Sequence, residues 1–312
     1  MRVLLALDGS AAADHARVLT GSLDWPAGSV IEVVAVARST LALTALDPSA
    51  PALEEQRARL DRVVADAARA LSGGPLSVET RVLSGRPASI IVDEAARFRA
   101  DLVIVGSRGH GPIPTMLLGS TSAEVVDRAP CPVLVARSEQ IGSVVLGVDG
   151  SETAQLAIDY LAGFGLLKAL PSTVVSVVPP MPPLVDPMSG IGFGMYAEPP
   201  ERAGAAFSEA RAAHERIAMN AAHDLRAAGF DPACEVRDGD PAHVLIELAR
   251  QRPDALLVVG THGRTGITRV VLGSVARNVL LHAGASVLVV RGPVRERQPT
   301  RMAQAAAVGL SS

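Results

Sequence analysis

Hydrophobic positions along this chain fall in short apolar runs that alternate with longer segments of helical spacing. The runs at residues 2–7 and 101–105 are nearly all apolar, as strands buried on both faces of a sheet should be. Between them lies an amphipathic pattern with apolar positions at Leu53, Leu60, Val64, Ala67 and Leu71. Strands that alternate with helices predict a doubly wound, mostly parallel α/β sheet.

The same order of elements occurs twice, because the sequence repeats itself once. Residues 3–10 return at 144–151, an offset of 141 residues, and residues 85–88 return at 239–242, an offset of 154. The difference of 13 residues is an insertion in the second copy. It falls in the Pro- and Gly-rich stretch 179–204, which we predict to be a surface loop.

A repeat of this length is a duplicated domain rather than a solenoid unit. We therefore predict one domain at residues 1–138 and a second at 141–293. The remaining tail, 294–312, lacks clear periodicity and is predicted to be disordered.

Composition limits the possible functions. Apolar residues make up 48% of the 312 residues and aromatics only 3%, so the core must consist of Val, Leu, Ile and Ala. The net charge is −3 without a basic block, which argues against nucleic-acid binding. No apolar run is long enough to cross a bilayer, and the N-terminus lacks a signal-peptide layout, so we expect a cytoplasmic protein. Cys131 and Cys234 lack CxxC spacing and predict neither a zinc site nor a disulfide.

A glycine segment follows the fourth predicted strand of each copy. In the first copy it is Gly106-Ser107-Arg108-Gly109, then nine residues, then Gly119-Ser120. In the second it is Gly260-Thr261-His262-Gly263, then nine residues, then Gly273-Ser274. In doubly wound sheets ligands bind beyond the carboxyl ends of the strands. A glycine turn with exposed N–H groups and a helix N-terminus both favour an anion, so the segment predicts a phosphate site.

An alternative is that these segments are only tight turns followed by a capped helix. Thr121 to Glu124 fits a capping box, which would explain part of the pattern by helix stability alone. Two copies with identical spacing favour nucleotide binding instead. The pattern is neither a P-loop nor the dinucleotide-binding GxGxxG order.

Asp8 and Asp149 end the first strand of each copy, before Gly-Ser. Ser10 and Ser151 are predicted to cap the helix that follows. The carboxylates can accept hydrogen bonds from a ribose or an adenine edge, or help to hold a metal; the alternative is an Asx-turn that orders the loop. Because both copies place the acid at the same point, we prefer the ligand-binding interpretation.

The pattern G-x2-G-x9-G-[ST], with a first strand that ends in Asp-Gly-Ser, resembles the ATP-binding type of the universal stress protein family. The resemblance covers about residues 1–137 and 141–291. It implies two flavodoxin-like, adenine-nucleotide-hydrolase-like sheets in tandem, with ATP as the ligand, with or without Mg²⁺.

The resemblance also implies roles for individual residues. It places Asp8 and Asp149 against the adenine or ribose, and the base beside Val36, Val105, Val177 and Val259. Around the phosphates and ribose it places Gly106, Arg108, Gly109, Gly119, Ser120 and Thr121, and in the second copy Gly260, His262, Gly263, Gly273, Ser274 and Val275. Pro112 and Pro114 stiffen the segment of the first copy, so the second copy is the favoured site if only one is occupied.

Family members usually dimerise through their last strands. Here 133–136 and 287–290 can pair within one chain and cover two sheet edges, which predicts an intramolecular pseudo-dimer. Further pairing of chains into a homodimer stays open.

The leading hypothesis is a nucleotide-dependent stress-response regulatory module that is read by a protein partner. No triad, carboxylate pair or metal cage is evident, so we name no catalytic residue and no metal ligand, and we expect any ATP hydrolysis to be slow. The alternatives are a slow ATPase or phosphoryl-transfer enzyme, and a nucleotide-free scaffold. The sequence leaves open whether AMP or a cyclic nucleotide competes with ATP, and which stress or partner is involved.

Overall fold

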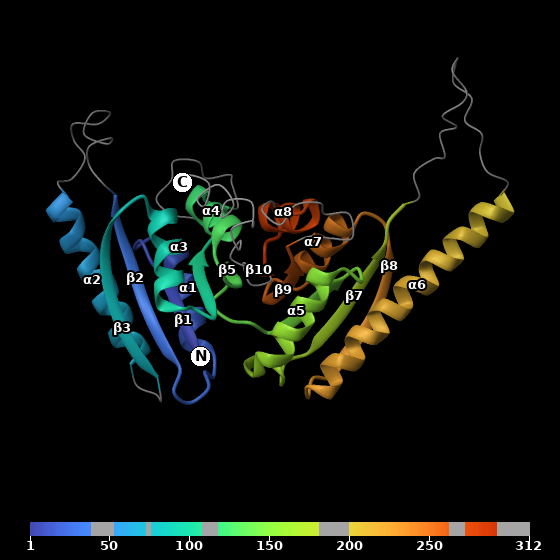
Figure 1. The fold of residues 1–312 in the computed structure, drawn as a ribbon, viewed down its shortest axis with the longest axis horizontal. Coiled ribbons are helices and arrows are strands. Elements are labelled where there is room, and N and C mark those ends of the chain that lie inside the picture. Colours follow the sequence, from blue (N-terminus) through green and yellow to red (C-terminus); the bar gives the residue numbers. More distant parts are fainter. Residues whose placement is uncertain (39–52, 73–75, 108–117, 181–199, 262–271, 292–312) are drawn as a thin grey trace, which may run out of the picture.

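The computed structural model describes residues 1–38, 53–72, 76–107, 118–180, 200–261 and 272–291, and these form one ten-stranded sheet covered by helices (Figure 1). The strands are β1 (Arg2–Ala6), β2 (Val30–Arg38), β3 (Ser77–Gly85), β4 (Leu102–Gly106), β5 (Val133–Ala136), β6 (Ser143–Val148), β7 (Ser172–Val178), β8 (Pro232–Asp238), β9 (Ala255–Gly260) and β10 (Ser286–Val290). The helices are α1 (Ala11–Ser22), α2 (Leu53–Leu71), α3 (Pro87–Phe98), α4 (Ser120–Arg128), α5 (Glu152–Gly163), α6 (Pro200–Ala227), α7 (Pro241–Gln251) and α8 (Ser274–His282), with a 3₁₀ turn at Gly165–Leu167.

The sheet consists of two parallel halves joined back to back. Its strand order is β3-β2-β1-β4-β5-β10-β9-β6-β7-β8, and every neighbouring pair is parallel except β5 with β10. This order confirms the predicted fold class of two doubly wound parallel sheets in tandem. It also shows that the two sheets are continuous through their last strands.

The junction between the halves has pseudo-twofold geometry. In the antiparallel β5–β10 ladder Leu134 lies opposite Leu288, its own counterpart at the offset of 154 residues. An isologous contact of this kind places each residue opposite its equivalent. The two repeats are therefore arranged within one chain as two identical subunits of a dimer would be.

Two equivalent arginines strengthen this junction. Arg137 follows β5 and donates to the carbonyl oxygens of Leu280 and Ala285, at and beyond the end of α8. Arg291 follows β10 and donates to the carbonyl oxygen of Ala129, at the end of α4, at 3.1 Å. A cation at a helix C-terminus is favourable because the last carbonyl groups lack intrahelical partners. Each repeat thus caps a helix of the other.

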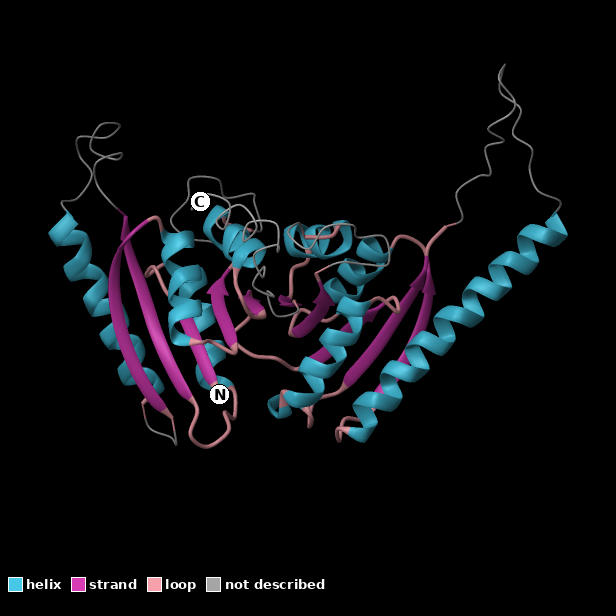
Figure 2. Cartoon of the chain, in the orientation of Figure 1, coloured by secondary structure: helices cyan, strands magenta, loops and turns pink. Residues whose placement is uncertain are grey.

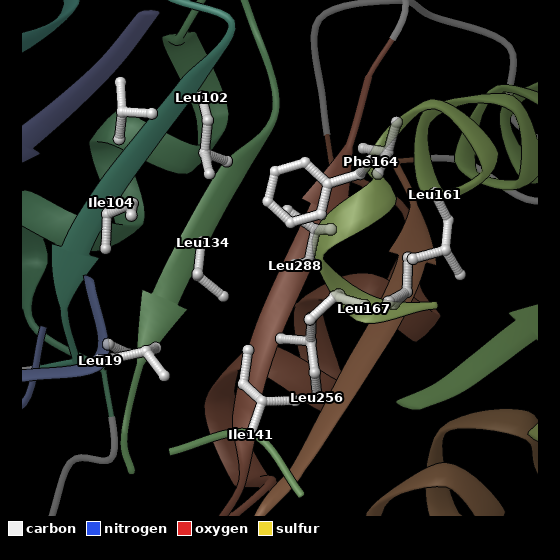
Figure 3. Packing of buried hydrophobic residues seen from close by; sticks show 14 of the residues in the cluster. Leu19, Leu102, Ile104, Leu134, Ile141, Leu161, Phe164, Leu167, Leu256 and Leu288 are labelled. Carbon is white, nitrogen blue, oxygen red and sulfur yellow. The ribbon is translucent and has the colours of Figure 1, made fainter. Parts of the chain in front are cut away.

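Helices cover both faces of the sheet (Figure 2). Alternate side chains of each strand point to opposite faces, so each helix packs against one of two sets of strand positions. One core cluster unites α1, α2, α5 and α6 with one set of strand positions, and a second cluster unites α3, α4, α7 and α8 with the other set. The first cluster crosses the junction, since it contains both Leu134 and Leu288, and Phe164 packs into it (Figure 3).

Most predicted elements agree with the structure. In α2 the predicted core positions Leu60, Val64, Ala67 and Leu71 are all buried. The loop predicted at 179–204 is wrong at its end, because α6 begins at Pro200 and its 28 residues make it longer than the 19-residue α2. Residues 181–199 of that loop and the predicted tail, 294–312, lie outside the described residues. Among the helices that the structure describes, none is long and apolar enough to span a membrane.

Candidate functional site

The predicted site lies where three parallel strands end side by side. Strand β1 lies between β2 and β4, and Ala6 pairs with Val34 on one side and with Val105 on the other. Asp8 therefore follows at the same edge as Val36 and Gly106. Strands β6, β7 and β9 repeat this arrangement in the second half. The topology thus brings the first-strand acid and the start of the glycine segment together twice.

The acid at the end of each first strand orders its own turn. The Asp8 Oδ1 atom accepts the N–H of Ser10 at 2.9 Å, and Asp149 Oδ1 accepts the N–H of Ser151 at 3.0 Å. Gly9 between them has a φ of 78°, in the left-handed region that glycine adopts without strain. One oxygen of each carboxylate is thus engaged in the Asx-turn that we considered as the alternative. Whether either acid also contacts a nucleotide stays a prediction.

The capping prediction for the following helices is confirmed. Ser10 Oγ accepts the N–H of Ala13 at 3.2 Å at the start of α1. Ser151 Oγ accepts the N–H of Ala154 at 3.2 Å at the start of α5. These helix N-termini are occupied by side chains of the protein.

Helices α4 and α8 begin differently. Their N-caps are Gly119 and Gly273, which provide no side-chain cap. The first intrahelical acceptors are the carbonyl oxygens of these glycines, which bind the N–H groups of Ala123 and Arg277 at 2.9 Å. The first three N–H groups of each helix precede those bonds and point out of the helix end. Together with the helix dipole they form a site that favours an anion.

The capping box at Thr121 to Glu124, which we considered as part of the alternative, does not form. Helix α4 starts at Ser120 with Gly119 as its N-cap, two residues earlier than that capping box requires, and Glu124 instead binds Arg86 and Arg128. Ser122 donates its hydroxyl to the carbonyl oxygen of Gly106 at 2.7 Å, in a buried position. This bond ties the first turn of α4 to the end of β4.

The residues that flank each nine-residue segment make the same two hydrogen bonds in both repeats. The N–H of Ser107 donates to the carbonyl of Ala136 at 3.1 Å. The carbonyl of Ser107 accepts the N–H of Gly119 at 2.7 Å. In the second repeat Thr261 makes the equivalent bonds with Val290 and Gly273, at 3.1 and 2.6 Å. The base of the predicted cradle therefore has the same geometry in both halves.

Four of the predicted phosphate-binding residues lie outside the described part of the chain. They are Arg108, Gly109, His262 and Gly263. Their predicted roles are therefore untested.

The first glycine of each segment is required by packing. A Cβ atom on Gly106 would lie 2.5 Å from the carbonyl oxygen of Ala12, and one on Gly260 would lie 2.6 Å from that of Thr153. Such a distance is far inside van der Waals contact. Glycine at these positions lets the strand end approach the first turn of α1 or α5, a role that the sequence pattern did not reveal.

The valines predicted beside the base differ in exposure. Val105 and Val259 are each 4% exposed and Val177 is 6% exposed, so these three belong to the core as the structure stands. Val36 is only half-buried. Of this set, Val36 offers the most surface to a ligand.

A groove of about 270 Å³ opens between α1 and α2 in the first repeat, and the sequence did not predict it. It shares the turn residues Gly9 and Ser10 with the predicted site. Its other walls come from Leu7, which follows β1, and from the two helices, including Asp14, Arg17 and Asp66. The groove depends on how two helices pack, which no local motif encodes.

A second feature missed in the sequence is an ion-pair cluster beside the start of α4. Arg86 lies 2.8 Å from Glu124, and Arg128 lies 2.6 Å from the other oxygen of the same carboxylate. Arg86 and Glu124 are 38 residues apart, and only the packing of α3 against α4 brings them together.

One buried hydroxyl of the described residues lies beside a histidine. The hydroxyl of Ser176 donates to the carbonyl of Val148 at 2.9 Å and lies 2.8 Å from His214 Nδ1, but Ser176 is fully buried. Within the same described ranges, no group of three or more His, Cys, Asp or Glu side chains could hold a metal ion.

The fold, and the residues at the carboxyl ends of its strands, define a tandem α/β protein with one candidate anion site in each half. The sequence model of the universal stress protein family matches residues 1–137 and 141–291. The chain belongs to this family.

Individual relatives agree with this assignment. A universal stress protein of Mycolicibacterium smegmatis is 29% identical over 281 residues, which cover 86% of this chain and 83% of the relative. The universal stress protein Rv2005c of Mycobacterium tuberculosis is 30% identical over 229 residues, 69% of this chain and 70% of the relative. The crystal structure of a universal stress protein from Archaeoglobus fulgidus shares the fold, with a TM-score of 0.63, 18% identity, and coverage of 93% of this chain and 98% of that one.

Proposed function

We propose that this universal stress protein is a regulatory module that binds ATP at the edge of each half-sheet. The observation that carries the proposal is the start of α4 and of α8, where helix N–H groups without a side-chain cap lie at the same sheet edge as the first-strand acid. Where the residue before the helix is described, Ser10, Ser151 and Asp240 cap α1, α5 and α7, and α3, which has no cap bond, begins at Pro87, a residue without an N–H.

The residues at this edge fit an adenine nucleotide. The N–H groups of Ser120 and Thr121, and those of Ser274 and Val275, would bind phosphate oxygens. The base would lie toward Val36 or Val177, and the ribose toward Asp8 or Asp149. Mg²⁺, when it accompanies ATP, would bind as part of the nucleotide complex.

The regulatory part of the proposal is that a protein partner distinguishes the ATP-bound from the ATP-free state. Such a partner responds only if it binds the two states with different affinity. We propose binding without efficient hydrolysis, in the cytoplasm, with slow ATP hydrolysis as the alternative.

The test uses glutamate at the first position of each helix, Ser120→Glu and Ser274→Glu. Both serines are exposed, and an acidic side chain in the first turn of a helix is favourable to the helix itself. The new carboxylate should repel phosphate while it leaves the fold intact. Isothermal titration with ATP should show two sites in the unchanged protein, one in each single variant and none in the double variant.

The matched control is Ala11→Glu, at the first position of the capped helix α1. Glu152 occupies the same position in α5, so the substitution is compatible with the fold. ATP binding should be unchanged in this variant. If the unchanged protein fails to bind ATP, or if the two serine variants bind as it does, the proposal is wrong. Steady phosphate release that disappears with one serine variant would favour the slow ATPase.

A further inference from the structure

We infer that Arg59 of α2 binds the ribose hydroxyls of the nucleotide in the first repeat. This inference rests on the proposed function and adds to its site a residue that the sequence pattern did not indicate. It comes from the position of the Arg59 guanidinium group, which lies beside Asp8 at the carboxyl end of β1.

Helix α2 packs against the turn that contains Asp8. A Cβ atom on Gly9 would lie 3.0 Å from Cγ2 of Val63, so the helix approaches this turn closely. Arg59 precedes Val63 by about one helical turn and lies on the same face of α2. Its Nη2 atom donates to the carbonyl oxygen of Asp8 at 3.3 Å. The guanidinium group is thereby held at the sheet edge, at the residue to which we assign the ribose.

Arg59 reaches this edge from the face of the sheet opposite to α4. Helix α2 belongs to the core cluster that also contains α1, whereas α4 belongs to the cluster on the other face. In the proposed binding mode the N–H groups at the start of α4 bind the phosphates from that other face. A second donor beside Asp8 is therefore placed for the sugar rather than for the phosphates.

The side chains of Asp8 and Arg59 together match the chemistry of a ribose. A hydroxyl group donates one hydrogen bond and accepts others. The Asp8 carboxylate can only accept, and one of its oxygens already accepts the N–H of Ser10. The guanidinium group of Arg59 can only donate. An acid and an arginine side by side thus supply both the acceptor and the donor that a pair of ribose hydroxyls needs.

The fold does not require an arginine at this position. Arg59 is exposed, and at the offset of 154 residues its counterpart in α6 is Ala213. Close by, Ile217 packs against Gly150 as α2 packs against the turn of the first repeat. Arg59→Ala therefore introduces a side chain that the same fold already carries at the equivalent place.

The experiment is a cycle between one residue and one feature of the ligand, made in Ser274→Glu so that only the first site is observed. Isothermal titration measures the dissociation constants of ATP and of 2′,3′-dideoxy-ATP, which lacks both ribose hydroxyls. Arg59→Ala should weaken ATP binding by roughly tenfold, as expected for the loss of a hydrogen bond to a charged group. Binding of dideoxy-ATP should weaken by less than about twofold, since the contact is already missing.

The matched control is Arg57→Ala, which removes the same charge from the same helix. Arg57 is exposed, and side chains two positions apart on a helix point to nearly opposite sides, so Arg57 is directed away from the turn at Asp8. Both ligands should bind this variant as they bind the Ser274→Glu parent. Equal losses of ATP and dideoxy-ATP affinity in Arg59→Ala would show that Arg59 acts through its charge alone. That result would overturn the inference and leave ATP binding intact.

A second background separates a contact with ribose from an effect on Asp8. Asp8→Asn retains an Oδ1 acceptor for the N–H of Ser10 and so retains the turn. In this background Arg59→Ala should still weaken ATP more than dideoxy-ATP. If the selective loss disappears, Arg59 acts only through Asp8 and the ribose contact is wrong. If the unchanged protein fails to bind ATP, the proposed function fails and this inference fails with it.

Discussion

A buried carboxyl group in the first repeat has no counterpart in the second. The Glu32 side chain is fully buried on β2, with Oε2 2.6 Å from Arg97 and no partner for Oε1 among the described residues. Glu94 of α3 shares the same guanidinium. Burial, reinforced by the neighbouring Glu94 carboxylate, raises the pKa of Glu32 to about 7. The equivalent residues in the second repeat are Thr173 and Leu248.

This pair predicts a pH-dependent stability. Because the folded-state pKa of Glu32 lies above its ordinary value of 4.5, its protonated form is favoured in the folded state, and the stability this contributes is lost as the pH rises from about 4.5 through about 7. Glu32→Gln should match the unchanged protein near pH 4.5 and exceed it at pH 8 by about 2 kcal/mol. Thermal unfolding at a series of pH values measures this.

The control for that prediction is Glu79→Gln. Glu79 is the register partner of Glu32 on β3 but is exposed. It should show no such pH-dependent gain. A constant difference between Glu32→Gln and the unchanged protein across the pH range would contradict the buried-carboxyl explanation.

Gly106 is a second residue whose importance is structural. Gly106→Ala should destabilise the protein by about 1–3 kcal/mol, because the added Cβ would meet the Ala12 carbonyl at 2.5 Å and force the strand away from α1. Denaturant unfolding measures the loss. Gly163→Ala, at the end of α5 where a Cβ meets nothing within 4 Å, should be neutral or slightly stabilising. Equal effects of the two substitutions would show that the close approach is unimportant.

At the scale of elements, the starts of the helices divide into capped and uncapped ones. Ser10, Ser151 and Asp240 cap their helices, whereas α4 and α8 start at glycines without a side-chain cap. A missing cap costs stability unless a ligand supplies it. Helix α3 also lacks a side-chain cap, but it begins at Pro87, which has no N–H to leave free. The helices after the glycine segments begin with three residues that each carry an N–H, which is why we assign the phosphates to them.

Helix α7 offers a direct measure of a cap in this fold. Asp240→Ala should cost about 1 kcal/mol of stability, because it removes the bond to the N–H of His243. Arg86→Ala at the equivalent position of α3 should cost less, since Arg86 makes no cap bond there. Chemical denaturation of both variants tests this, and a larger loss for Arg86→Ala would contradict it.

At the scale of the whole molecule, the junction joins the two repeats into one continuous sheet with a shared core. The antiparallel β5–β10 ladder, the shared core and the reciprocal arginines all cross it. The parallel edges that a single repeat would expose at β5 or β10 are thereby covered. Further pairing of chains stays a prediction.

If the junction couples the two repeats, removing Arg137 and Arg291 should weaken that coupling. In Arg137→Ala/Arg291→Ala the carbonyl groups at the ends of α8 and α4 lose their partners, so the repeats should unfold less cooperatively. Calorimetry should show one transition in the unchanged protein and two in the double variant. Arg57→Ala, an exposed residue of α2, is the control and should keep one transition. A single sharp transition in the double variant would show that the strands and core alone couple the repeats.

Local and repeated patterns were sufficient for most of the architecture. Apolar runs, helical spacing and the offsets of 141 and 154 residues predicted the strand and helix order, the duplication and the caps at Ser10 and Ser151. These features depend on backbone geometry and on burial at a fixed period, which a sequence displays directly. The pairing of the last strands was predicted from the resemblance to the universal stress protein family.

Other features depend on residues that are distant in the sequence, and only the tertiary structure decided them. The pairing of Glu124 with Arg86, the packing role of Gly106 and the Glu32–Glu94 pair all require knowing which elements pack together. A local motif specifies the conformation of its own segment. The partner of a side chain is set by how whole elements pack, and that information is spread over the entire chain.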